Sequence, residues 1–132
     1  MINIQKSTQK ETGKTNQFIE NGISYKKSAI NGYSSGKFNK ELTYSTILMS
    51  IENYLVGFLE NTGIVPLSHT FTELTGELLT TGIITGEFAS EIKKIDEHFN
   101  LCSLDPFQMP VINDDLIHWL FTIADNLGKL HK

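Results

Sequence analysis

The feature that most constrains the fold is an unbroken series of structural signals in residues 48–79, LMSIENYLVGFLENTGIVPLSHTFTELTGELL. Leu48, Ile51 and Leu55 lie at helical spacing, and a second apolar stripe that includes Tyr54 runs beside them. A helix with two adjacent apolar stripes must be covered on most of its sides. This segment is therefore predicted to contain the central helix of a bundle.

The same segment marks where that helix ends and where the next one begins. Gly63 can adopt the left-handed conformation that ends a helix, and the following Pro66 prevents the helix from resuming immediately. Thr70 and Glu73 have the spacing of a capping box, in which the two residues bind each other's backbone N–H groups. A helix, a sharp turn and a second, capped helix are therefore predicted.

The rest of the chain predicts three more helices, so that the fold class is all-α, an up-and-down bundle of about five helices. Residues 1–14 are predicted to be a flexible lead-in, and residues 15–132 a single domain. Residues 100–112 contain two prolines without a helical period and predict a loop. The predicted helices start at Thr15 or Asn16, at Lys37, at Ser68, after Thr85 and after Asn113, and the second and third end at Thr62 and Thr80.

Composition narrows the classes of function. The net charge of −4 argues against strong general binding to nucleic acid, which needs a basic face. No apolar run is long enough to span a bilayer, and the start of the chain lacks a secretion signal, so a cytoplasmic location is expected. The chain has eleven lysines and no arginine, and seven of the lysines precede residue 41. An anion-facing surface is therefore expected on the first two helices.

At residues 51–59 (IENYLVGFL) and 63–69 (GIVPLSH), followed by Leu74, the chain resembles the HEPN domain (higher eukaryotes and prokaryotes nucleotide-binding). Members of this family carry a long helix, a small turn and a Pro-x-x-His segment that opens the third helix. The resemblance extends over residues 15–131, with Asp96 to Phe99 similar to the family's Asp-x-x-aromatic stretch. Leu and Asp stand where the family has an Arg-Tyr pair before a proline.

The resemblance implies a module that works as a homodimer in the bacterial cytoplasm, with a nucleotidyltransferase-type partner, in a toxin–antitoxin or nucleotide-handling system. Many HEPN proteins cleave RNA with an Arg-x4-6-His motif, which cannot be present in a chain without arginine. Lys93 and His98 form the nearest substitute, but two acids lie between them and Lys offers only a point charge. We therefore expect a divergent, non-catalytic member with an interaction or regulatory role, and keep a degenerate ribonuclease as a minor alternative.

A second hypothesis is a nucleotide-binding protein that uses the groove between the second and third predicted helices. Lys37, Lys40 and His69 would then meet a phosphate, with His69 at a helix N-terminus, where the helix dipole favours an anion. Alternatively, the ring of His69 packs over the turn. Trp119 and Phe121 are candidates for a dimer interface on the last helix. No metal site and no cofactor are predicted, because the four histidines lack metal-ligand spacing.

Overall fold

The computed structural model describes residues 14–104 and 111–131, which contain five α-helices and no strand. The all-α class is thereby confirmed for these ranges, whereas residues 1–13 of the predicted lead-in lie outside them. No helix in these ranges is both long and apolar enough to cross a membrane. The helices are α2 (Gln17–Ser34), α3 (Lys40–Thr62), α4 (Phe71–Thr81), α5 (Gly86–Leu104) and α6 (Asp114–His131).

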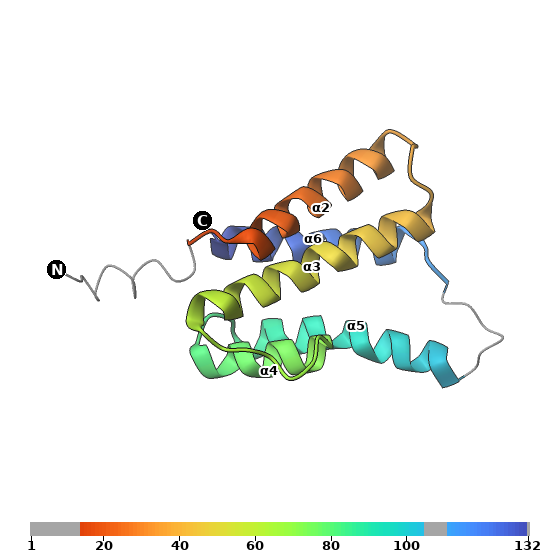
Figure 1. The fold of residues 1–132 in the computed structure, drawn as a ribbon. Helices are drawn as coiled ribbons and strands as arrows, with labels where there is room; N and C mark the ends of the chain where they lie inside the picture. The colour runs from red at the N-terminus through yellow and green to blue at the C-terminus, as the bar shows by residue number, and fades with distance from the viewer. Residues whose placement is uncertain (1–13, 105–110, 132) are drawn as a thin grey trace.

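Helix α3 is the centre of the molecule, as its two apolar stripes predict. Helices α2 and α6 pack against one side of it, and the antiparallel pair α4 and α5 packs against the other (Figure 1). Ile51, Leu55, Phe58 and Leu59 of α3 are completely buried. Burying a side chain of this size contributes about 1.5–3 kcal/mol, so the packing of α3 supplies much of the stability of the fold.

The sequence predicts that α3 begins at Lys37, but the helix begins at Lys40. The side chain of Asn39 caps it by accepting a hydrogen bond from the backbone N–H of Leu42 at 2.8 Å. The backbone N–H of Phe38 turns back to the carbonyl of Gly32 at 2.9 Å. Residues 35–39 therefore form a turn, and the Asn39 cap starts α3 three residues later than the glycine break at Gly36 suggests.

Two of the predicted capping residues between α3 and α4, Gly63 and Thr70, are confirmed. Gly63 ends α3 in the left-handed conformation, with a φ of 79°. Thr70 caps α4 by accepting a hydrogen bond from the backbone N–H of Glu73 at 3.1 Å. Helix α4 thus starts at Phe71, three residues after the predicted start at Ser68.

The connection between α3 and α4 departs from the up-and-down order. It runs back along α3, and His69 contacts Glu52, ten residues before the end of that helix. Helix α4 consequently runs in the same direction as α3 and antiparallel to α5 (Figure 1). The bundle is therefore a three-helix layer of α2, α3 and α6 that is covered by a helical hairpin.

The predicted loop of residues 100–112 is wrong over its first five residues, because α5 continues to Leu104. No glycine or proline occurs between residues 100 and 104 to end a helix. Residues 105–110 lie outside the described ranges.

Candidate functional site

The connection between α3 and α4 presents the two most exposed large apolar side chains among the described residues. Val65 is 84% exposed and Leu67 is 90% exposed, on either side of Pro66. Ile64 of the same segment instead packs against the core. Turns are normally rich in Gly, Asn, Asp and Ser, so a Val-Pro-Leu sequence at this position was the available signal of an exposed apolar tip. We call residues 64–67 the apolar tip.

The first end of the apolar tip is held by the C-terminus of α3. The backbone N–H of Ile64 donates to the carbonyl of Leu59, and that of Gly63 donates to the carbonyl of Glu60, both at 3.1 Å. This pair of bonds, together with the left-handed Gly63, is the geometry of a Schellman-type helix end. The chain therefore leaves α3 in a fixed direction.

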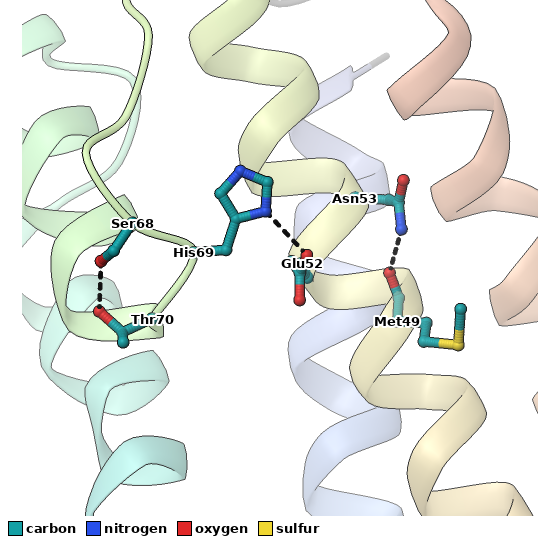
Figure 2. A network of polar contacts seen from close by, with 6 residues as sticks. All are labelled: Met49, Glu52, Asn53, Ser68, His69 and Thr70. Carbon is teal, nitrogen blue, oxygen red and sulfur yellow. Dashed lines mark hydrogen bonds and ion pairs between the residues drawn. The ribbon is translucent and has the colours of Figure 1, made fainter.

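The second end is held by His69, which the sequence had suggested as a phosphate ligand. The ring points at α3, where its Nδ1 lies 3.0 Å from a carboxylate oxygen of Glu52 (Figure 2). The side chains of His69 and Glu52 are 52% and 41% exposed, so the contact contributes only about 0–1 kcal/mol. The contact between His69 and Glu52 mainly determines position, because it places the returning chain against the middle of α3.

The N-terminus of α4, just after His69, is occupied by a carboxylate of the protein itself. Asp96 of α5 accepts hydrogen bonds from the backbone N–H groups of Phe71 at 3.2 Å and of Thr72 at 2.6 Å. A helix leaves its first N–H groups without intrahelical partners, and its positive end attracts an anion. Asp96 and Thr70 satisfy these groups, so the anion position that the sequence offered to a phosphate is already filled.

The three candidate phosphate ligands do not converge. Lys37 is exposed in the turn before α3, and the ammonium of Lys40 lies 4.0 Å from Asp114 at the start of α6. Glu52, the contact of His69, lies twelve residues after Lys40 on α3, which corresponds to about 18 Å along the helix axis. His69 and the two lysines therefore belong to different parts of the surface.

Lys93 and His98 are likewise kept apart, although both lie on α5. Five residues on an α-helix correspond to a rotation of about 140°, which places the two side chains on different faces. Lys93 is exposed, whereas the ring of His98 lies beside that of Tyr44, with ring centroids 6.2 Å apart. The arrangement gives a phosphate no common contact with both residues.

Trp119 and Phe121, the dimer-interface candidates, both contact their own chain. The indole N–H of Trp119 donates to the carboxylate of Glu91, which ties α6 to α5. The ring of Phe121 meets that of Tyr33 edge to face at a centroid distance of 5.7 Å. Both rings are partly buried, so much of the apolar surface that the sequence left for a partner is used within the chain.

The charged residues that neighbour the apolar tip along the chain are acidic. Between residues 60 and 77 the carboxylates are Glu60, Glu73 and Glu77, and this range contains no lysine. The adjacent Glu52 adds a fourth carboxylate through its contact with His69. The apolar tip is thus held at both ends, and the charged residues that flank it along the chain are acidic.

Comparison with protein-family models, curated proteins and solved structures finds no match to this chain. The HEPN resemblance accordingly stays a prediction. Within the ranges that the structure describes, no three His, Cys, Asp or Glu residues gather as a group able to hold a metal ion.

Proposed function

We propose that this protein is a non-catalytic helical interaction module that docks onto a partner protein through the apolar tip. The observation that carries the proposal is that Val65 and Leu67 are almost fully exposed while the backbone on both sides of them is fixed. A segment that is ordered before binding loses little conformational entropy when it binds, which raises affinity. Burial of two such side chains in a partner adds about 1.5–3 kcal/mol each.

The surroundings of the apolar tip define the chemistry of the partner. An apolar pocket would receive Val65 and Leu67, and a basic rim would face the glutamates around them. Charges at the rim of an interface mainly set the association rate and the choice of partner, whereas the apolar centre supplies most of the affinity. We therefore expect association to slow in high salt while the complex still forms.

The resemblance to HEPN domains extends this proposal. It suggests a nucleotidyltransferase-type protein as the partner, within a toxin–antitoxin or nucleotide-handling system in the cytoplasm. The absence of arginine and the separation of Lys93 from His98 support a non-catalytic role. A homodimer through Trp119 and Phe121 is compatible with docking at the apolar tip, because α6 packs on the opposite side of α3.

The test is a selection of random twelve-residue peptides displayed on phage against the immobilised full chain. We expect enriched peptides to combine apolar residues with Lys or Arg, and to lose binding to a Val65→Ser/Leu67→Ser variant. Val111→Ser is the matched control, because Val111 is also an exposed apolar residue, at 77%, but lies before α6. Thermal unfolding of all three proteins verifies that each is folded.

Two results would contradict the proposal. One is an enriched peptide set that binds the double variant as well as the wild type. The other is a solution mass showing a dimer that the double variant converts to a monomer, because the tip would then be the contact between two copies of this chain. Light scattering at several protein concentrations measures that mass.

A further inference from the structure

A cleft on the opposite side of α3 from the apolar tip has the reverse charge. It lies between α2 and α6, with Tyr54 of α3 among its lining residues, and has a volume of about 470 Å³. Ligand pockets in proteins span about 300–1,000 Å³, so the space fits a small organic molecule. Basic, acidic and apolar side chains all line it, among them Lys26, Lys27, Lys129, Asp125, Ile23 and Ile30.

The cleft concentrates positive charge in an acidic protein. Three lysines and one aspartate line it, which leaves a formal net charge of +2 with His131 neutral, against −4 for the whole chain. Lys26 pairs with Asp125 at 2.8 Å and is 23% exposed. Among the described residues, Lys27 and Lys129 have no carboxylate partner. Their ammonium groups are available to an external anion.

Hydrogen-bond donors converge on one point of α6. A Cβ added to Gly128 would lie 3.2 Å from the ammonium nitrogen of Lys26 and 3.4 Å from the hydroxyl oxygen of Tyr54. The absence of a side chain at Gly128 thus lets an ammonium and a phenol hydroxyl approach the backbone of α6 closely. Burial and then the charge of Asp125 raise the pKa of Tyr54, so its hydroxyl keeps its proton and can donate.

Apolar surface adjoins these donors. Ile23 and Ile30, one on each side of the lysine pair along α2, line the same cleft as the ring of Tyr54. An inorganic ion would contact only the charged part of this lining. A ligand that combines a dianionic group with an apolar or aromatic body would use both parts.

We propose that the cleft between α2 and α6 is a binding site for a small phosphate monoester with an apolar or aromatic body. The phosphate contacts Lys26, Lys27 and Lys129, and the body lies against Ile23, Ile30 and Tyr54. Asp125 competes with the phosphate for Lys26, so it limits the affinity of the site. This site is separate from the apolar tip, and its test does not depend on the proposed docking function.

The experiment titrates the full chain with phenyl phosphate by isothermal calorimetry, with phenol and inorganic phosphate as separate ligands. We expect phenyl phosphate to bind at least tenfold more tightly than either part alone. A Lys27→Gln/Lys129→Gln variant should lose at least tenfold in affinity. The control is Lys93→Gln/Lys94→Gln, which removes the same charge from α5 and should bind as the wild type does.

Asp125→Asn supplies a result that damage to the fold cannot produce, because it should increase the affinity for phenyl phosphate several-fold by releasing Lys26. Circular dichroism and the melting temperature verify the fold of each variant. The proposal is overturned if phenyl phosphate produces no heat at millimolar concentration, or if inorganic phosphate binds equally well. Equal affinity in the Lys27/Lys129 variant and its control would also overturn it.

Discussion

The two sides of α3 differ in how closely other parts of the chain pack against them and in which side chains they expose. On the side of α2 and α6, packing is so close that Gly57 leaves no space for a Cβ, which would lie 2.6 Å from the side chain of Ile19. On the other side, the connection to α4 exposes Val65 and Leu67 to solvent. Lysines line a cleft on the first side, whereas on the second side the apolar tip is flanked along the chain by glutamates.

The difference shows how a short all-helical chain can carry two surfaces without sharing residues between them. The α2 side is defined by helix–helix contact, and its shape depends on side-chain volume. The α4 side is defined by hydrogen bonds at helix ends, and its shape depends on capping groups such as Asp96 and Thr70. Substitutions of volume and of capping groups should therefore affect the two sides separately.

The largest effect is expected from adding a methyl group where α2 and α3 meet. Gly57→Ala should lower the free energy of unfolding by about 2 kcal/mol, because the new Cβ would lie 3.0 Å from the backbone nitrogen of Ile19 as well as against its side chain. Gly76→Ala on α4 is the control. No atom lies within 4 Å of a Cβ there, so helix propensity should stabilise the protein by about 0.5–1 kcal/mol.

Urea denaturation of both variants measures these changes. Equal effects at the two glycines would show that the α2 side is no more tightly packed than the exposed face of α4.

The next effect concerns the cap of α4. Asp96→Ala should destabilise the protein by about 1–2 kcal/mol, because two backbone N–H groups lose a charged acceptor. Glu97→Ala removes the same charge from an exposed neighbour and should change stability by less than about 0.5 kcal/mol. Urea denaturation gives both values, and amide hydrogen exchange at Thr72 should quicken only in the Asp96 variant.

The hydrogen bond from Trp119 of α6 to Glu91 of α5 joins the two sides of α3, and its contribution to stability should depend on pH. Hydrogen bonds from Trp119 and then Lys94 lower the pKa of Glu91 below its ordinary value of 4.5. A carboxyl group with a lowered pKa stabilises the folded state above that ordinary value, and the contribution is lost as the pH falls through the folded-state pKa. Glu91 is substantially exposed, at 41%, so solvent screening keeps the contribution below about 1 kcal/mol.

Comparison of the wild type with Glu91→Gln checks this pH dependence, since Gln still accepts a hydrogen bond from the indole. Their free energies of unfolding should differ at pH 7 and converge below pH 4.5. A difference that persists in acid would mean that the charge of Glu91 has no part in the link.

The sequence predicted those features that depend on neighbouring residues. The buried stripes of α3, the left-handed Gly63 and the Thr70 cap all follow from local spacing, and the structure has them. Features that depend on distant residues could not be predicted in this way. Asp96 reaches α4 from α5 across 25 residues of chain, and no local pattern marks its carboxylate as a cap.

The candidate site illustrates the same limit. His69 has the position of a phosphate ligand only if the N–H groups of α4 are free, and Asp96 fills them. The lysine cleft joins Lys26 and Lys27 to Lys129, which the sequence separates by about a hundred residues. The sequence shows that the N-terminal third is basic, but only the fold shows that Lys129 of α6 lies at the same cleft.

The smallest effect compares one ion pair from each side of α3. Lys26 and Asp125 are 2.8 Å apart and are 23% and 51% exposed, whereas His69 and Glu52 are 3.0 Å apart and are 52% and 41% exposed. A charge that is partly withdrawn from solvent is screened less, so double-mutant cycles should give a coupling near 1 kcal/mol for the first pair and about 0.3 kcal/mol for the second. Addition of 1 M NaCl should reduce the second coupling by the larger fraction. A coupling at His69 as strong as that at Lys26 would mean that exposure to solvent does not set the strength of these two ion pairs.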